Sequence, residues 1–187
     1  MKTITEKQAI ELLKKYAPNN SIFQRVYQHC KTVQKAALAI AQEIQKNGKK
    51  VDLELIKIGS LLHDIGRFQV PPKHEKSLQH GMLGGKILRK EGLIKLARIC
   101  ERHIGAGITK EEIIKFKLPL PKKDLLPKSI EEKIVNYADD LVFSDRIATL
   151  SEVVKKYKKE VPSPKALKRM IDLHNEIEKL RGGTYFL

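Results

Sequence analysis

The chain contains no tryptophan and few aromatic residues, which make up 5% of its 187 residues. Surfaces that stack the bases of single-stranded nucleic acid depend on aromatic side chains, so this scarcity argues against such a surface. No apolar run reaches the ~18 residues that a membrane-spanning helix requires, and the N-terminus lacks the apolar stretch of a secretion signal. We therefore expect a cytoplasmic protein with no membrane partner.

Acidic residues are also scarce, because 22 Asp and Glu stand against 37 Lys and Arg, for a formal net charge of +15. Much of the excess lies in polar helical stretches such as Lys155 to Lys159, and no known nucleic-acid-binding motif is present. Three explanations stay open: attraction of anionic substrates, loose contact with nucleic acid, or a Lys- and Glu-rich surface of the kind found in hyperthermophiles. We favour the first and third together.

Only two cysteines are present, Cys30 and Cys100. Both fall on inward faces of predicted helices, where we expect small apolar residues of a reducing compartment rather than a disulfide. With 41% hydrophobic residues, the chain can bury a core without a cross-link. Because no repeat and no Pro- or Gly-rich linker divides it, residues 1–187 are predicted to form one domain, with its oligomeric state left open.

Apolar residues recur at helical spacing along most of the chain, which predicts an all-α fold. Helices are predicted over residues 21–46, 51–63 and 93–103, and from residues 129 and 164 onward. Their expected N-caps are Asp52, Ser129 and Ser163, and Ser129 opens a capping box with Glu132. The segment 118–128 carries three prolines and is predicted to be a flap or an exposed loop.

Histidines and aspartates fall on the inward faces of these helices. His29 and Asp139 lie among the apolar residues of two of them. His63 and Asp64 would diverge by about 100° on a continuous helix, but Gly66 is placed to end that helix, so both side chains can turn to one point. Buried carboxylates without a partner are costly. A shared transition-metal cation would neutralise this set, and a buried salt-bridge network is the alternative.

Two further histidines extend the pattern. His80 precedes closely spaced glycines, which allow close backbone approach, and His103 ends the helix predicted over 93–103. Both are expected to point inward, with a hydrogen-bonded core histidine as the alternative. We adopt that alternative for His174, which lies in an apolar stripe, and we interpret His74 as part of a polar loop.

At these residues the chain resembles the HD-domain superfamily of metal-dependent phosphohydrolases, in its His-Asp-Ile-Gly branch. The resemblance rests on the ordered set His29, His63-Asp64-Ile65-Gly66, His80-Gly-x-x-Gly-Gly, His103-Ile-Gly-Ala-Gly and Tyr137-Ala-Asp139-Asp140-Leu. It covers about residues 21–146 and leaves 147–187 as a C-terminal helical extension. It implies a helical bundle with a five-helix core plus flanking helices.

The resemblance also implies metal ligands. In the family, the first histidine, the HD pair and the last aspartate bind one ion, and the matching residues are His29, His63, Asp64 and Asp139. Members with a second ion add histidines that match His80 and His103, and the HD aspartate bridges the two ions. The implied ion is Fe, Mn, Ni, Co or Zn, with Mg as an alternative. Many two-metal members carry paired histidines where this chain has Arg102-His103, so a second ion and the substrate's own cation both stay open.

The implied activity is hydrolysis of a phosphomonoester or pyrophosphate bond in a nucleotide or similar small phosphate by metal-activated water. Asp64 and Asp140 are the candidate catalytic residues. Asp140 would orient a ligand or move a proton, and a surface carboxylate is its alternative. The candidate phosphate contacts are Arg67, which replaces a lysine common in the branch, Lys86 and Arg146, each with a solvated side chain as its alternative.

Other functions stay open. The branch also includes RNA and cyclic-dinucleotide phosphodiesterases, although the Gly-Tyr-Pro signature of one cyclic-dinucleotide group is absent here. A nucleic-acid binder whose metal only holds the helices together would show tight, strongly salt-dependent binding to DNA or RNA, with an affinity that Asp64→Ala leaves unchanged. A ligand-sensing domain would keep a bound nucleotide without turnover. We favour the hydrolase of a small nucleotide.

Overall fold

The computed structural model describes residues 2–143, 146–161 and 163–183. These residues form nine α-helices: α1 Glu6–Tyr16, α2 Asn20–Lys46, α3 Leu53–Leu62, α4 His80–Lys90, α5 Ile94–Arg102, α6 Lys110–Lys115, α7 Ile130–Leu141, α8 Leu150–Glu160 and α9 Pro164–Arg181. The short elements are the 3-10 helices η1 Ile65–Phe68 and η2 Ser77–Gln79 and the strands β1 Val142–Phe143 and β2 Arg146–Ile147. The predicted all-α fold class is confirmed.

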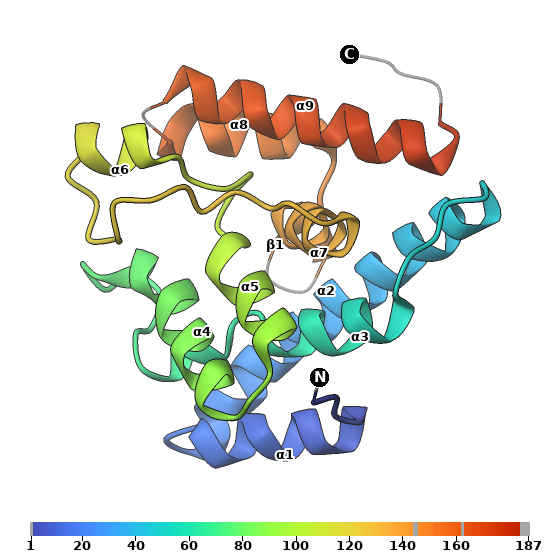
Figure 1. Ribbon diagram of the computed structural model, residues 1–187. Coiled ribbons are helices and arrows are strands. Elements are labelled where there is room, and N and C mark those ends of the chain that lie inside the picture. Colours follow the sequence, from blue (N-terminus) through green and yellow to red (C-terminus); the bar gives the residue numbers. More distant parts are fainter. Residues whose placement is uncertain (1, 144–145, 162, 184–187) are drawn as a thin grey trace.

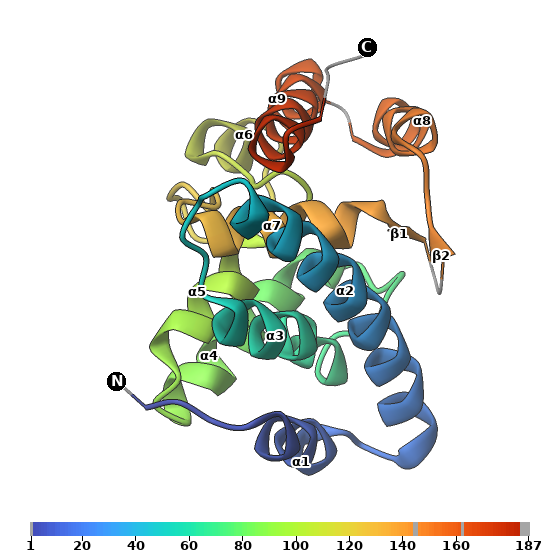
Figure 2. The same cartoon turned by 90° about the vertical axis from the view of Figure 1, so that its right-hand side faces the viewer.

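The helices form a central bundle with flanking helices at two ends. In the bundle α2 packs against α3 and α7, and α4 packs against α5. Figures 1 and 2 show α1 at one end of the molecule and α6, α8 and α9 together at the opposite end. The central helices α2, α3, α4, α5 and α7 therefore match the five-helix core expected from the resemblance.

The buried core contains the residues that the apolar spacing of the sequence predicted. The stripe predicted along α2 is buried, and its members are Val26, Cys30, Val33, Ala37, Ile40 and Ile44. The apolar helix α3 contacts α1, α2, α5 and α7, so Leu61 and Leu62 are fully buried. Complete burial of one such side chain contributes roughly 1.5–3 kcal/mol, so α3 is anchored at the end that leads into His63.

Side-chain caps fix where the site-bearing helices begin. Asp52 Oδ1 accepts from the Leu55 amide at 3.0 Å, and the Ser129 hydroxyl accepts from the Glu132 amide at 3.2 Å. The predicted capping box also requires the Glu132 carboxylate to accept from the Ser129 amide. That part of the prediction is wrong, because the carboxylate accepts from the Lys128 amide at 2.7 Å instead. Ser163 caps α9 as predicted, while Pro162 of the same sequence break lies outside the described residues.

Glycines allow α4 to lie directly against η1 and α5. A Cβ atom added to Gly66 would overlap the carbonyl oxygen of His80, and one added to Gly81 would lie 2.6 Å from the carbonyl oxygen of Cys100. The backbones that carry three of the predicted ligands can therefore approach one another only because side chains are missing here.

Two features of the connections were not expected from periodicity. Strands β1 and β2 pair antiparallel, with Val142 opposite Ile147, and form a short hairpin between α7 and α8. The proline-rich segment 118–128 is a connection without a helix, as predicted, but Leu125 is buried and its backbone pairs with Ile108. No helix among the described residues is long and apolar enough to cross a membrane.

Candidate metal centre

The six predicted ligands come from the ends of separate helices and from the middle of α2. His63 directly follows α3, His103 directly follows α5, His80 begins α4, Asp64 precedes η1, Asp139 lies in the last turn of α7, and His29 lies within α2. Five of them line a cavity of ≈ 470 Å³, and His63 lies fully buried behind it. The bundle thus brings together residues that are up to 110 positions apart in the chain.

Asp139 and two histidines form the first part of the centre. Asp139 Oδ1 lies 3.0 Å from His29 Nε2 and 3.4 Å from His63 Nε2. The second carboxylate oxygen of Asp64, Oδ2, lies 3.8 Å from His29 Nε2 and 3.9 Å from His63 Nε2. One ligand atom from each of His29, His63 and Asp139 lies within 4.8 Å of the others, which is close enough to hold one metal ion.

The other oxygen of Asp64 faces a second pair of histidines. Asp64 Oδ1 lies 3.1 Å from His80 Nε2 and 3.5 Å from His103 Nε2. One carboxylate therefore presents its two oxygens to two different pairs of imidazoles. This is the arrangement that a bridging ligand between two cations requires.

The imidazoles are oriented by their other nitrogen. In His63, His80 and His103, Nδ1 lies 2.7 Å from the carbonyl oxygen three residues earlier in the chain, to which it can donate. The Nε2 atoms then present lone pairs to the centre. Those of His80 and His103 are only 2.9 Å apart, and that of His63 is buried with no hydrogen-bond partner among the described residues. Facing lone pairs need a proton or a cation between them. Imidazole nitrogens with carboxylates fit a divalent transition metal.

The carboxylates are held in their ionised form. Burial alone would raise the pKa of Asp64, but the imidazoles of His80 and His63 outweigh burial and hold the pKa well below its usual range. For Asp139, burial is likewise outweighed by His63 and His29, so its pKa is also well below the usual range. Ionised carboxylates are the form that ligates metals.

Asp140 has a different environment from its neighbour in the chain. It lines the same cavity, and its Oδ2 accepts a hydrogen bond from the Tyr157 hydroxyl at 2.8 Å. Burial, followed by the adjacent charge of Asp139, raises the pKa of Asp140 to about 7. A carboxyl group with this pKa can exchange a proton near neutrality, which is the capacity that the predicted proton shuttle needs.

Only one of the three predicted phosphate contacts lines the cavity. Arg67 does so, with Nε 3.3 Å from Asp64 Oδ1 and Nη1 2.8 Å from Ser77 Oγ. Lys86 is exposed on α4, and Arg146 is exposed and forms an ion pair with Glu152 at 2.6 Å. Neither is among the described residues that line the cavity.

Sequence reasoning missed two basic residues that line the cavity, Arg25 and Lys156. Arg25 lies four residues before His29 on α2, so helical spacing from a predicted ligand was a usable signal. Lys156 was interpreted as part of a solvated stretch. It reaches the cavity because α8 folds back past β1, where its Nζ lies 4.8 Å from the Phe143 ring centroid.

A buried amide, also missed, fixes the loop that follows His103. Asn136 is fully buried, and its Nδ2 donates to the carbonyl oxygens of Arg102 at 2.9 Å and Gly105 at 2.5 Å. The Arg102 side chain points to the Glu132 carboxylate at 2.7 Å. This arginine, which stands where many two-metal relatives carry a histidine, is thus used in an ion pair between α5 and α7.

The remaining histidines and the cysteines lie as interpreted. His174 Nδ1 lies 2.7 Å from the Tyr137 hydroxyl, and His74 Nδ1 accepts from the Lys76 amide at 3.0 Å. Cys30 and Cys100 are both buried and free. Cys100 Sγ lies 3.1 Å from the carbonyl oxygen of His63, so this thiol packs beneath the centre.

Three proteins of other organisms are similar to this chain in sequence. It is 43% identical over 174 residues to an uncharacterized protein of Methanocaldococcus jannaschii, covering 92% of this chain and 96% of that protein. It is 40% identical over 158 residues to a tRNA (cytidine(56)-2'-O)-methyltransferase of Picrophilus torridus, covering 84% of this chain and 42% of that protein. A protein of the same name from Thermoplasma volcanium is 36% identical over 178 residues, with 95% and 48% covered. The chain thus spans under half the length of both methyltransferases.

Solved structures and a family model agree on the fold. The HD domain of the phosphodiesterase PgpH from L. monocytogenes superposes with a TM-score of 0.53 at 20% identity, covering 93% of this chain and 97% of that one. A second structure of that domain, in complex with cyclic-di-AMP, also has a TM-score of 0.53 at 20% identity, with 96% and 100% covered. The family model for the HD domain matches residues 26–143. This chain belongs to the HD-domain family.

Proposed function

We propose that this protein is a metal-dependent phosphohydrolase that acts on a phosphomonoester or pyrophosphate bond of a nucleotide or similar small phosphate. The observation that carries the proposal is the carboxylate of Asp64, whose two oxygens face two separate pairs of histidines. Membership of the HD-domain family supports it. So does the complex of the PgpH domain with a nucleotide, cyclic-di-AMP.

The residues fit one or two divalent ions. His29, His63, Asp64 and Asp139 would hold the first ion, and His80, His103 and Asp64 would hold the second. When bound, a divalent cation lowers the pKa of water toward about 7 and withdraws charge from a phosphoryl oxygen. The donor set favours Fe, Mn, Ni, Co or Zn, and Mg is the alternative ion.

The chain's own residues would bind and orient the substrate. Arg67, Arg25 and Lys156 place positive charge around the cavity, where they would neutralise phosphate oxygens. Asp140 would accept or donate a proton at its Oδ1, because Oδ2 accepts from the Tyr157 hydroxyl. Lys86 and Arg146 stay candidate contacts only for a substrate that extends beyond the cavity.

The test combines metal analysis of the purified protein with a phosphate-release screen over nucleotides in Mn, Fe, Co, Ni, Zn and Mg. His63→Ala and Asp64→Ala should each reduce the rate of phosphate release by at least ~100-fold. Loss of a residue that only supports a metal ligand costs about 10–100-fold, and loss of the ligand itself should cost at least as much. His174→Ala is the matched control, since His174 lies outside the centre and bonds Tyr137. Phosphate release that persists in His63→Ala and Asp64→Ala, or no release by the unaltered protein with any of these metals and nucleotides, would contradict the proposal.

A second candidate is cleavage of a phosphodiester bond in RNA or in a cyclic dinucleotide. It is favoured by the similarity of the chain to two tRNA methyltransferases and to the HD domain of a phosphodiesterase. The two candidates are distinguished if short RNA and cyclic dinucleotides are added as substrates and their cleavage is followed by chromatography, because hydrolysis of a phosphodiester leaves a phosphomonoester and releases no free phosphate. Cleavage of these substrates without phosphate release from mononucleotides would establish the second candidate.

A further inference from the structure

A second hollow opens beside the metal cavity, between the loop 104–108 and helices α6, α8 and α9. This hollow, which we call the apolar chamber, has a volume of ≈ 320 Å³. Its apolar lining includes Leu78, Ile104, Ile108, Phe116, Leu118 and Val161. Figures 1 and 2 show α6, α8 and α9 gathered at the same end of the molecule, and residues of all three helices line the chamber.

The apolar chamber and the metal cavity share a wall. Ile104, Gly105, Asp140 and Lys156 line both. If the phosphate of a substrate lies at the candidate metal centre, the part of the substrate attached to that phosphate would therefore extend into the apolar chamber. The two hollows differ in chemistry, because one is lined by imidazoles, carboxylates and basic side chains and the other mainly by hydrocarbon.

Three apolar side chains of the chamber are not used by the core. Ile104, Ile108 and Phe116 are each half-buried, and none of them belongs to the core cluster or packs against it in the described structure. Half-buried hydrocarbon that no neighbour covers gains free energy when a ligand covers it. The chamber volume lies within the range of small-molecule sites.

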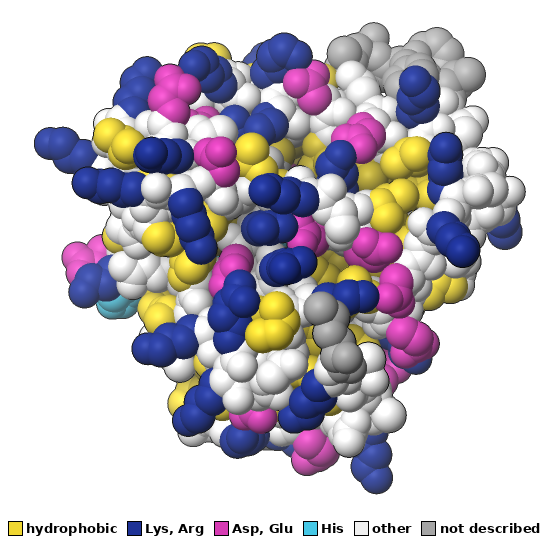
Figure 3. All heavy atoms as spheres, viewed as in Figure 1, with side chains coloured by type: hydrophobic (Ala, Val, Ile, Leu, Met, Phe, Trp, Pro, Cys, Tyr) yellow, Lys and Arg dark blue, Asp and Glu magenta, His cyan; other side chains and the backbone are white. Residues whose placement is uncertain are grey.

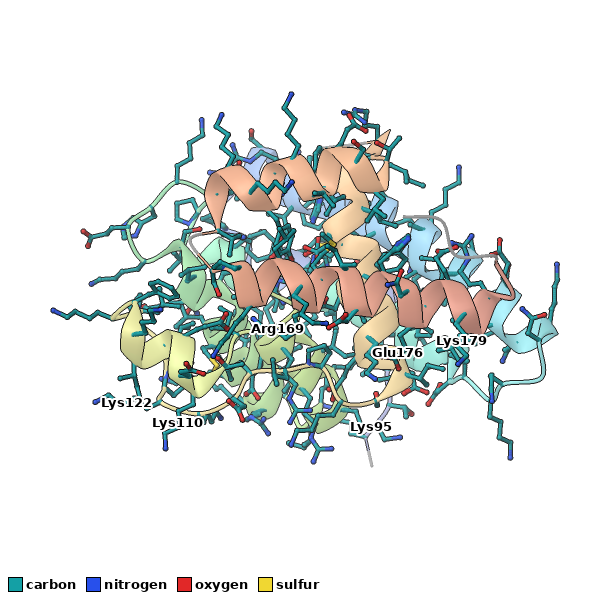
Figure 4. The ribbon with its side chains drawn as sticks, turned by 90° about the horizontal axis from the view of Figure 1, so that it is seen from above. Lys95, Lys110, Lys122, Arg169, Glu176 and Lys179 are labelled. Atoms are coloured by element: carbon teal, nitrogen blue, oxygen red, sulfur yellow. The ribbon has the colours of Figure 1, made fainter. Side chains whose placement is uncertain are left out.

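Polar groups in the lining restrict what the apolar chamber can bind. Glu112 and Arg169 form an ion pair at 2.7 Å that lines the chamber, and Arg169 also donates to the carbonyl oxygen of Gly107 at 2.8 Å. Arg169 belongs to α9, and Figure 4 shows it on the side of that helix toward the yellow helix α6. Apolar walls interrupted by hydrogen-bonding groups suit a flat heterocycle, which has apolar faces and polar edges, better than a lipid chain.

We propose that the apolar chamber binds the nucleobase of the substrate, with the ring of Phe116 against its face, while the phosphate lies at the metal centre. This inference rests on the proposed function and adds to it the part of the molecule that selects a nucleotide over a simple sugar phosphate. Lys156, on the shared wall, would contact the phosphate or ribose that joins the two hollows.

The test uses the absence of tryptophan from the chain. Phe116→Trp places a single tryptophan in the apolar chamber, directly after α6, and Ile114→Trp places one two residues earlier, within α6, at a side chain that is 50% exposed and outside the chamber. AMP, GMP, CMP or UMP should change the emission of the first variant and not the second. Ribose 5-phosphate, which has no base, should change neither. The same change in both variants, or none in Phe116→Trp, overturns the inference.

Kinetics supply an independent measurement. Phe116→Ala should lower kcat/KM for the best nucleotide by about 10-fold, the size expected for a lost stacking contact, and should change kcat/KM for ribose 5-phosphate by less than about two-fold. Ile114→Ala should change neither value. An equal loss for both substrates would overturn the inference.

The outcomes separate this inference from the proposed function. If no compound releases phosphate but nucleotides still change the emission of Phe116→Trp alone, the chamber assignment stands and the hydrolase proposal fails. If release is robust but neither emission nor kcat/KM depends on Phe116, the hydrolase proposal stands and the chamber assignment fails.

Discussion

In three histidines of the candidate metal centre, one ring nitrogen orients the ring and the other faces the centre. In His63, His80 and His103 the Nδ1 atom is held by a carbonyl oxygen three residues earlier, at or near the end of a helix. The rings are therefore oriented by the backbone before any ion binds. A helix that ends at a ligand supplies both the ligand and the carbonyl that aims it, since the last carbonyls of a helix have no partner within it.

Gly66 gives a prediction at this scale. Gly66→Ala should lower the free energy of unfolding by about 3 kcal/mol, because the added Cβ would overlap the backbone of His80 and force α4 away from η1. The comparison is Gly48→Ala, which meets no atom within 4 Å but has a φ of +78°. That variant should lose only about 1–2 kcal/mol from backbone strain. Urea unfolding of both variants measures the difference, and equal losses would contradict the overlap.

The residue types at the centre were predictable from the sequence, and some partners were not. The inward positions of His63, His80 and His103 follow from helix periodicity together with Gly66. The position of Arg102 does not, because its pairing with Glu132 depends on how α5 lies against α7. Lys86 and Arg146 are candidates because they are near predicted ligands in the sequence. Nearness in sequence does not determine whether a side chain points toward the cavity once the helix has ended or turned.

At the scale of elements, the short helix α6 depends on its contacts with α9. The Glu112 carboxylate accepts from Thr109, from Ser163 at 2.7 Å and from Arg169 at 2.7 Å. Burial by itself would raise the pKa of Glu112, but these hydrogen bonds and the Arg169 charge outweigh it and lower the pKa. The carboxylate therefore joins two helices that border the apolar chamber.

The lowered pKa of Glu112 has a consequence for stability. A carboxyl group with a depressed folded-state pKa stabilises the fold above its unfolded-state pKa of about 4.3, and the contribution is lost as the pH falls through the folded-state value. Glu112→Gln should cost about 1.5–3 kcal/mol at pH 7 and should weaken the loss of stability below pH 4.3. Denaturation midpoints between pH 7 and pH 3 test this.

The neighbouring acid is the control for this experiment. Glu111→Gln removes an ion pair with Lys165 in which the Glu111 side chain is 67% exposed and the Lys165 side chain is 73% exposed. This variant should lose under about 1 kcal/mol of stability, and its pH profile should change little. If the two variants behaved alike, the buried contacts of Glu112 would not be the cause of the pH dependence.

Helix positions could be predicted well, and the path of the chain between helices could not. The caps at Asp52, Ser129 and Ser163 are local contacts within three residues, so the sequence contains them in full. The return of α8 over the centre depends on the hairpin of β1 with β2 and on long-range packing. This is why Lys156 appeared to be a solvated residue.

The molecule as a whole carries a net charge of +15. Figure 3 shows Lys and Arg side chains spread across the face in view, with Asp and Glu between them. Such a distribution attracts anions from a distance. The basic residues that line the metal cavity would then act on anions that have already approached.

A prediction about nucleic acid follows from this surface. Binding of a mixed-sequence RNA should be weak and fall at least ~10-fold between 50 and 200 mM salt, since it rests on displaced counterions. Asp64→Ala should leave the affinity unchanged. Filter binding at both salt concentrations measures it. Tight binding that persists at 200 mM salt and depends on Asp64 would instead point to RNA as the substrate.

The hydrogen bond from Tyr157 to Asp140 has a wider consequence. The family match ends at residue 143, yet Tyr157 and Lys156, further along the chain, complete the walls beside the reactive groups. Proteins with identical signature residues can therefore differ in what they accept, according to the helix that follows the signature. Exchanging that helix between relatives is a way to transfer selectivity while the chemistry stays in place.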